Sequence, residues 1–390
     1  MAHELDQATA APYSDFQNEL YGAREAPAFP VDWRALEAAA TAAMSPEAAD
    51  YVAGGAGGEE TVRANREAFD RWRIVPRMLR GVGTRDLATE ILGTPMPAPV
   101  LVGPVGVQRI VHPDAETATA RAAASLGVPY VHSTAASTSI EDAAAAGGDG
   151  PRWFQLYFPT RRDVAASFVE RAEAAGYRAV VVTLDTLILG WRPRDLGRAY
   201  LPFLDGIGLA NYTSDPVFMR GLDGERLETT VAAWIETFAS PDLSWADIAW
   251  LRERTGLPLL VKGVNTGEDA RCALEAGVRG IVVSNHGGRQ LDGAIAALDA
   301  LPDVAAAVPS AVPVLFDSGI RTGADAVKAL ALGARAVLLA RPVMWGLALG
   351  GEAGVRHVLR TFLGELDNTL AEAGYRSHRE LAHGSLAPRP

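Results

Sequence analysis

Short apolar segments recur along the chain, and helical patterns lie between most of them. Eight segments have the length of a strand: residues 98–103, 129–133, 152–158, 179–185, 258–263, 280–285, 313–319 and 336–341. Nearly continuous apolar strands are typical of parallel sheets that are buried on both faces. Several helical stretches end in glycine, a common helix stop. The pattern predicts an α/β fold, a closed (β/α)8 TIM barrel, with a doubly wound open sheet as the alternative.

Two segments do not follow this repeat. Residues 1–97 carry helical patterns at about 33–53 and 58–69, so we expect an N-terminal helical segment packed on a barrel of residues 98–390. Residues 186–243 form a long insertion after the fourth strand, rich in glycine, proline and aromatic residues. A loop much longer than about 15 residues within a compact domain is usually functional, so we expect this insertion to act as a lid.

Polar residues gather where the predicted strands end. In barrels of this type, chemistry takes place at the carboxyl ends of the strands. In chain order, these ends carry Pro104, Ser133, Gln155, Tyr157, Thr183, Asp185, Lys262, His286, Arg289, Asp317 and Arg341. One polar residue at a strand end has no special meaning, but this concentration predicts a binding or catalytic site at one end of the barrel.

The last two strand ends predict a phosphate site. The sequence DSGIRTG at 317–323 would open a helix with small residues and free backbone N–H groups, and Arg341 follows the eighth strand. Loops after strands seven and eight commonly bind phosphate in these barrels, and helix N-termini favour anions. We expect the phosphate to belong to a cofactor. Two ordinary glycine turns are the alternative.

Lys262 ends a fully apolar strand, where a charged side chain needs a partner. It could be a Schiff-base lysine or a fixed cation beside an electron-rich ring. The structural alternative is an ion pair with Asp185 or Asp317.

The segment SNHGGRQ combines a candidate base with a candidate anion clamp. His286 follows the sixth strand, and Arg289 comes three residues later. An imidazole titrates at about pH 6.5 and can take up a proton at neutral pH, whereas a guanidinium stays charged and offers a planar fork to a carboxylate. The glycines between them let a ligand approach the backbone. A lone histidine is more often structural, as His112 or His132 would be.

Composition and charge narrow the classes of function. Hydrophobic residues make up 48% and charged residues 21% of the 390, an ordinary globular balance. A net charge of −11 without a basic stripe argues against a nucleic-acid partner. The single cysteine, Cys272, excludes an intrachain disulfide and a CxxC metal site, so we expect no metal and a cytoplasmic protein. Residues 1–22 lack signal-peptide features, and no apolar run reaches the ~20 residues of a membrane span.

The motifs SNHGGRQ, FDSGIRTGADAVKALALGA and ARP resemble those of the FMN-dependent α-hydroxy-acid oxidases and dehydrogenases. Other segments resemble this family in the same order, among them DYVAGGAGGE, GPVGVQRIVHPDAE, STAAST, FQLYFP, TLDT and LVKGV. The resemblance covers roughly residues 15–385 and implies FMN as the cofactor of a barrel enzyme.

The resemblance also implies roles for individual residues. The catalytic residues would be His286, Asp185, Tyr157 and Lys262. The substrate would be bound by Tyr51, Tyr157, Arg192 and Arg289. FMN would be bound by Pro104, Val105, Gly106, Ser133, Gln155, Thr183, Lys262, Ser284, Asp317, Gly319, Arg321, Ala340 and Arg341. Within this set, the ribityl phosphate would be bound by Asp317, Gly319, Arg321 and Arg341.

Within the family, the long insertion with GWRPRDL is most similar to that of lactate 2-monooxygenase. That similarity implies L-lactate and O2 as substrates, acetate, CO2 and water as products, and a homo-oligomer, a tetramer or octamer. Gly106 stands where many oxidases of the family carry alanine, and a glycine there would change the room beside the flavin.

Other functions remain open at this point. The nearest alternative is an (S)-2-hydroxy-acid oxidase that releases the keto acid and H2O2. A quinone- or cytochrome-linked dehydrogenase is less expected, because no membrane segment or haem motif is visible. Outside the family, the alternatives are a Schiff-base aldolase that uses Lys262 and a barrel that only binds an anion.

Overall fold

A closed barrel of parallel strands forms the centre of the protein. The computed structural model describes residues 12–223 and 226–389. Residues 1–11, the start of the expected N-terminal segment, lie outside the described residues, and they are the first half of residues 1–22, in which we expect no signal peptide. The barrel strands are β4 (Val100–Val102), β5 (Tyr130–Ser133), β6 (Arg152–Tyr157), β7 (Val180–Thr183), β8 (Leu259–Val264), β9 (Gly280–Val283), β10 (Val314–Phe316) and β11 (Ala336–Leu339). They pair in chain order, and β11 closes the barrel onto β4. Each predicted apolar segment coincides with one strand, and only β8 extends one residue beyond its segment, so the TIM-barrel prediction is confirmed and the open sheet is excluded.

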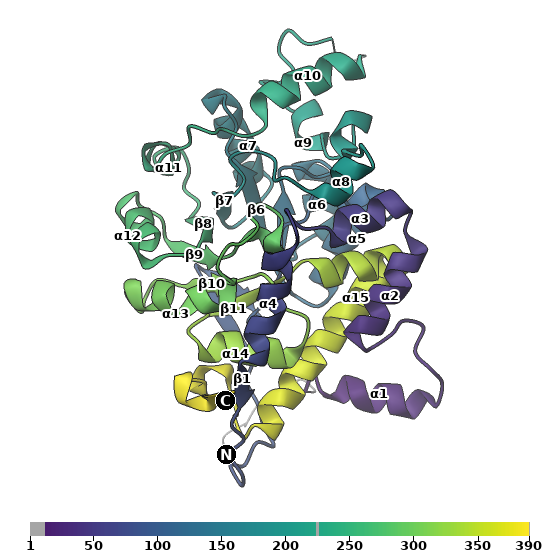
Figure 1. Cartoon of the computed structure of the whole chain (residues 1–390), viewed down its shortest axis with the longest axis vertical. Coiled ribbons are helices and arrows are strands. Elements are labelled where there is room, and N and C mark those ends of the chain that lie inside the picture. Colours follow the sequence, from purple (N-terminus) through teal and green to yellow (C-terminus); the bar gives the residue numbers. More distant parts are fainter. Residues whose placement is uncertain (1–11, 224–225, 390) are drawn as a thin grey trace, which may run out of the picture.

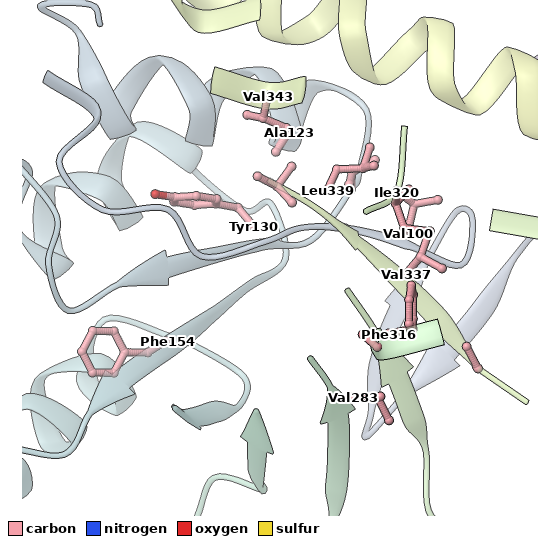
Figure 2. Close-up of a cluster of buried hydrophobic side chains, with 14 of the residues drawn as sticks. Val100, Ala123, Tyr130, Phe154, Val283, Phe316, Ile320, Val337, Leu339 and Val343 are labelled. Carbon is pink, nitrogen blue, oxygen red and sulfur yellow. The ribbon is translucent and has the colours of Figure 1, made fainter. Parts of the chain in front are cut away.

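A helix follows each barrel strand. These helices are α5 (Ala115–Ser125), α6 (Ile140–Gly147), α7 (Arg162–Ala174), α11 (Trp245–Arg252), α12 (Gly267–Glu275), α13 (Ala297–Ala307), α14 (Gly323–Ala331) and α15 (Arg341–Glu372), the last bent at Gly350 and Gly351. Alternate strand residues point outward, and Figure 2 shows Val100, Val337 and Leu339 in the core layer that Val343 of α15 also enters. Both faces of the sheet are therefore buried, as its apolar sequence requires.

A short hairpin fills the amino-terminal end of the barrel. It consists of β2 (Thr89–Ile91) and β3 (Thr94–Met96). Ile91 and Met96 join the cluster of inward-facing strand residues, and the Trp153 indole N–H donates to Thr94 Oγ1 at 2.9 Å. Because this end is packed, the carboxyl ends of the strands are left for a binding site. A second pair, β1 (Trp72–Ile74) with β12 (Leu386–Pro388), lies outside the barrel.

The N-terminal part is helical, but its boundaries differ from the prediction. It contains α1 (Asp15–Ala23), α2 (Trp33–Ala43), α3 (Pro46–Ala53) and α4 (Glu60–Asp70). The single helical pattern expected at 33–53 is wrong, because Ser45 starts a new helix. Its hydroxyl accepts the backbone N–H of Ala48 at 3.2 Å, and Pro46 occupies the first turn. In Figure 1, α1 and α2 lie along α15.

The insertion after β7 contains α8 (Pro193–Gly197), η2 (Pro202–Asp205), α9 (Ala210–Thr213) and α10 (Leu227–Thr237), which Figure 1 shows gathered at one end of the molecule. Much of it is firmly packed. The buried Asp215 carboxylate accepts hydrogen bonds from Ser167 at 2.7 Å and from Arg171 at 3.1 Å, both on α7. The remaining short helices are η1 (Gln108–Ile110), η3 (His286–Gly288), η4 (His378–Glu380) and η5 (His383–Ser385). Over the described ranges, every helix is too short or too polar to cross a lipid bilayer.

Candidate active site

A pocket opens at the carboxyl ends of the barrel strands and encloses about 1150 Å³ of space, its open mouth included. The expected site residues that line it are Tyr51, Pro104, Val105, Gly106, Tyr157, Arg192, Lys262, His286, Arg289, Asp317, Gly319, Arg321, Ala340 and Arg341. The others lie just behind this wall: Ser133, Gln155, Thr183, Asp185 and Ser284. The structure thus brings segments from most of the chain to one place.

His286 and Asp185 form a charge-assisted pair in this pocket. His286 Nδ1 lies 2.6 Å from Asp185 Oδ1, and Thr186 Oγ1 donates to the same carboxylate oxygen at 3.0 Å. An ionised carboxylate only accepts hydrogen bonds, so Nδ1 carries the proton and Nε2 is left as the basic atom. Nε2 lies 3.4 Å from the Tyr157 hydroxyl. The pair therefore presents a base and a phenol to the same point.

The charges of this pair are set by the surroundings. Burial lowers the pKa of His286 below its ordinary value, although the Asp185 carboxylate opposes the shift. Burial by itself would raise the pKa of Asp185, but the positive charges of His286 and Lys262 hold it at about 2. At neutral pH the imidazole is uncharged and the carboxylate is ionised, which is the state that a general base requires.

Lys262 forms ion pairs at the centre of the site. Its Nζ lies 3.3 Å from Asp317 and 3.8 Å from Asp185, and it donates to Ser284 Oγ at 2.9 Å. Burial alone would lower the pKa of Lys262, but the two carboxylates raise it. Lys262 therefore forms the ion pairs with Asp185 and Asp317 that we gave as the structural alternative. A lysine that stays charged is unsuited to Schiff-base chemistry, because only the neutral amine is a nucleophile. The carboxylate of Asp317, a residue that we expected at a phosphate, lies against this ammonium.

Gln155 links the ends of three neighbouring strands. Its Oε1 accepts the Ser133 hydroxyl at 3.0 Å, and its Nε2 donates to Thr183 Oγ1 at 2.9 Å. All three side chains are buried. Ser133 on β5 and Gln155 on β6 are register partners, whereas Thr183 on β7 lies opposite Tyr157, two residues further along β6. Amide and hydroxyl groups fixed in this way can supply hydrogen bonds to the edge of a polar ring.

Two arginines and Tyr51 make one wall of the pocket cationic. The guanidinium carbons of Arg289 and Arg192 lie 5.0 Å and 5.9 Å from the centre of the Tyr51 ring. Arg289 also donates to the backbone carbonyls of Tyr51 and Gly54, each at 2.7 Å. Burial and the neighbouring Arg192 lower the pKa of Arg289 to about 9. Two crowded cations of this kind favour an anionic ligand such as a carboxylate.

A second cationic group lies at the start of α14 and α15. Burial and Arg66 lower the pKa of Arg321 to about 10, and its buried Nε has no hydrogen-bond partner among the described residues. Arg341 is different, because its guanidinium donates to the carbonyls of Val52 at 3.0 Å and Gly287 at 3.0 Å. Arg341 therefore ties α3 to the His286 loop, while Arg321 keeps a donor available for an anion.

Gly106 is required by packing against the neighbouring loop. A Cβ at this position would lie 2.6 Å from the carbonyl oxygen and 2.9 Å from the Cβ of Ala135. The backbone N–H of Val107 donates to the same carbonyl at 2.9 Å. We expected Gly106 to change the space that is available beside the flavin ring. The structure shows that its missing methyl group would point at Ala135.

The sequence analysis missed several residues of the site. Thr186 touches the His286–Asp185 pair, and Gln290 contacts Arg192. Both directly follow residues that were singled out, in TLDT and SNHGGRQ, so a search of their immediate neighbours would have found them. Further lining residues come from the insertion and from α3: Leu189, Phe203, Phe238 and Val52. Apolar residues of this kind carry no chemical signal in a sequence.

Comparisons with known proteins agree with this arrangement. A family model described as FMN-dependent dehydrogenase matches residues 40–388. The chain is 43% identical to the FMN-dependent α-hydroxy acid dehydrogenase qulF of Penicillium citrinum, over 94% of this chain and 93% of the relative. It is 43% identical to an L-lactate oxidase of Lysinibacillus sphaericus, over 90% of each. A crystal structure of mandelate oxidase with (S)-4-hydroxymandelic acid superposes with a TM-score of 0.83, at 40% identity over 92% of this chain and 99% of that one.

The residues of the pocket fit FMN. The cofactor is a dianionic phosphate joined to a planar ring system with polar edges, and it needs cations at one end and fixed hydrogen-bonding groups at the other. Arg321 offers an unused buried donor, and Gln155 and Thr183 offer oriented polar groups. The fold, the family match and this fit agree, and the chain belongs to the family of FMN-dependent α-hydroxy-acid oxidases and dehydrogenases.

Proposed function

We propose that this FMN-dependent oxidoreductase of 2-hydroxy acids acts on a small (S)-2-hydroxy acid, with L-lactate as the first candidate. Its overall reaction would convert L-lactate and O2 to acetate, CO2 and water, as in lactate 2-monooxygenase. One observation carries this choice. The insertion contributes Leu189, Arg192, Phe203 and Phe238 to the same pocket as His286, so the substrate lies under a wall that can retain the product.

In this proposal, Arg192 and Arg289 bind the substrate carboxylate, beside Tyr51. The hydroxyl group of the substrate lies near Tyr157 and His286 Nε2, which are 3.4 Å apart. Nε2 takes up a proton from the substrate, and the ionised Asp185 stabilises the imidazolium that forms. The Lys262 ammonium supplies a fixed positive charge where negative charge develops.

FMN, when bound, would supply the transfer of two electrons from the substrate to O2, which would give pyruvate and H2O2. If the pocket holds the keto acid, pyruvate and H2O2 react there. The O–O bond breaks, the bond to the carboxyl group breaks, and the products are acetate, CO2 and one water. If the keto acid leaves first, the protein is an oxidase, as the names of relatives such as L-lactate oxidase suggest.

The residues that would hold FMN divide into three groups. Arg321, Gly319 and Arg341 would lie at the phosphate. Ser133, Gln155, Thr183 and Lys262, the last positioned by Ser284 and Asp317, would lie at the edge of the ring system. The backbone of Pro104, Val105, Gly106 and Ala340 would contact the cofactor where these residues line the pocket.

Replacing Arg321 with methionine should weaken FMN binding by about 100-fold, because a charge-assisted hydrogen bond to phosphate contributes roughly 1.5–3 kcal/mol. The measurement is the FMN dissociation constant, from the recovery of flavin fluorescence on dilution. Arg34→Met is the matched control, since Arg34 is exposed and stacks on Trp33, 4.4 Å from the ring centre. An equal effect of the two substitutions would contradict a phosphate site at Arg321.

Product analysis tests the monooxygenase outcome directly. FMN-loaded protein supplied with L-lactate in air should form one acetate and one CO2 for each O2 consumed, with little free H2O2. Catalase in the assay provides the control, because it would suppress decarboxylation of pyruvate by H2O2 in solution and leave the reaction within the pocket unchanged. Equal amounts of pyruvate and H2O2 would instead identify an oxidase.

A further inference from the structure

The first segment of the insertion, residues 186–192, is not held by hydrophobic burial. Ile188 is 68% exposed and Trp191 is 73% exposed, and the leucines beside them are also on the surface. Yet Thr186 and Arg192, at the two ends of the segment, are buried in the active site. Polar contacts and backbone packing must therefore fix the position of this segment.

Gln290 makes three hydrogen bonds to this segment and to Asp185, which precedes it, with one side chain. Its Nε2 donates to the backbone carbonyl of Asp185 at 3.2 Å and to that of Ile188 at 3.0 Å. Its Oε1 accepts Arg192 Nη2 at 3.1 Å. Both donors and the acceptor of the Gln290 amide are thus hydrogen-bonded: to Ile188 and Arg192 of the segment, and to Asp185, which precedes it.

The backbone of the segment also lies directly against Gln290. A Cβ at Gly190 would lie 2.4 Å from the carbonyl oxygen of Arg289 and 3.0 Å from Cα of Gln290. The segment can sit this close only because residue 190 is glycine. Arg192 Nε donates to the same Arg289 carbonyl at 3.2 Å. Residues 186–192 therefore pack directly against the backbone of residues 289 and 290.

Other contacts do not replace this anchor. Asp195 lies 3.5 Å from Arg192, but it belongs to the insertion itself and would move with it, and its Oδ1 has no hydrogen-bond partner among the described residues. The Trp191 carbonyl accepts the backbone N–H of Gly57 at 2.9 Å, which is a single bond at the exposed end. Thr186, at the start of the segment, contacts Asp185 at 3.0 Å and His286 at 3.3 Å, but both contacts are to the base and its partner. The Gln290 side chain joins the segment both to the backbone of Asp185 and to Arg192 of the anion clamp.

We propose that Gln290 is a positioning residue that latches residues 186–192 over the site and so determines how long the keto acid is retained. This inference rests on the proposed function. The latch fixes Arg192, which would hold the carboxylate of the keto acid, and the backbone of Asp185, which orients His286. Gln290 itself would touch neither substrate nor FMN.

The test compares Gln290→Met and Gln290→Glu with the wild type, all as FMN-loaded protein. Methionine has a similar length without hydrogen bonds, and glutamate keeps the acceptor for Arg192 but loses both donors. Pyruvate is the probe. Its dissociation from the oxidised holoenzyme, followed by stopped-flow flavin absorbance, should become at least about tenfold faster in both variants, because several hydrogen bonds are lost. KM for L-lactate should rise by a similar factor.

Leu291→Ala is the control, because Leu291 is the exposed neighbour of Gln290 and makes no side-chain hydrogen bond. The latch is contradicted if pyruvate leaves both Gln290 variants within twofold of the wild-type rate, or if Leu291→Ala accelerates it equally. FMN affinity should stay within twofold in each variant, whereas a general loss of structure would change it.

Product partition separates the latch from the proposed function. If the wild type forms acetate and CO2, the Gln290 variants should release most of their product as pyruvate and H2O2. If the wild type already releases pyruvate and H2O2, the monooxygenase proposal fails. The pyruvate dissociation rates then still decide whether Gln290 holds the segment.

Discussion

Replacing His286 with glutamine should lower kcat/KM for the 2-hydroxy acid by about 10⁴-fold, the upper range for loss of a general base. Glutamine is of similar size and can still accept a hydrogen bond, but it takes up no proton at neutral pH. The contact with Asp185 at 2.6 Å would also lose its charge, so the variant would stabilise no cation in the transition state. Steady-state kinetics with L-lactate and the rate of flavin bleaching under anaerobic conditions measure the effect.

His357→Gln is the control for this substitution, because His357 lies away from the pocket with its Nε2 3.2 Å from the carbonyl of Pro30. It should leave kcat/KM within twofold. The His286 variant should bind FMN as tightly as the wild type. A loss of less than tenfold in the His286 variant would show that another group accepts the proton.

The pH profile of the wild type supplies an independent check. Because burial lowers the pKa of His286, log kcat/KM should be flat from pH 8 down to its ordinary value of about 6.5 and fall only at lower pH. The Asp185 charge raises the pKa of His286, so Asp185→Asn should shift this acid limb to still lower pH while it reduces the plateau. An acid limb above pH 6.5 would contradict the burial argument.

Replacing Lys262 with methionine should lower the free energy of unfolding by about 3–5 kcal/mol, the range for removing one partner of a buried ion pair. Two nearly buried carboxylates, those of Asp185 and Asp317, would lose their counter-ion. The same change should slow reduction of the bound flavin, because a fixed positive charge is removed from the site. Urea denaturation of the FMN-loaded protein and anaerobic stopped-flow reduction measure the two effects.

Lys328→Met is the matched control, since Lys328 is the other lysine of the chain and its Nζ donates to the carbonyl of Phe69 at 2.8 Å without an ion pair to a site carboxylate. It should cost less stability and leave flavin reduction unchanged. Lys262→Met/Asp317→Asn should recover part of the lost stability. A loss below 1 kcal/mol in Lys262→Met would mean that water or protonation compensates both carboxylates.

The order and approximate positions of the barrel strands could be predicted from short local patterns of apolar residues. Each barrel strand coincides with a predicted apolar segment, to within one residue at the end of β8, because a strand covered on both faces must be apolar at nearly every position. The ends of these segments also located the site, since parallel strands in a barrel bring all their carboxyl ends to one rim. The helix boundary missed within 33–53, at Ser45 and Pro46, was set by capping residues that are present in the sequence but were not used in the prediction.

The chemical roles of the site residues were inferred from different information than their positions in the fold. Burial and charge alone pointed to a phosphate and to a base beside an anion clamp, whereas FMN came from resemblance to a family. The family match and the pocket agree on FMN as the cofactor. The substrate and the fate of the keto acid depend on the insertion, whose packing no repeat or period predicts.

The sequence by itself determined the barrel, the end of the barrel that carries the site and the residue types gathered there. This is because the burial and the direction of a strand are encoded by residues that are close together in the chain. Only the tertiary structure decided which of these residues are partners. Gln290 reaches Ile188 across 102 positions and Arg289 reaches Tyr51 across 238. Lys262 could have been a nucleophile or an ion-pair partner until Asp185 and Asp317 were placed beside it. Charge state and hydrogen-bond partners depend on distances of a few ångström between remote segments, and a linear pattern contains no such distances.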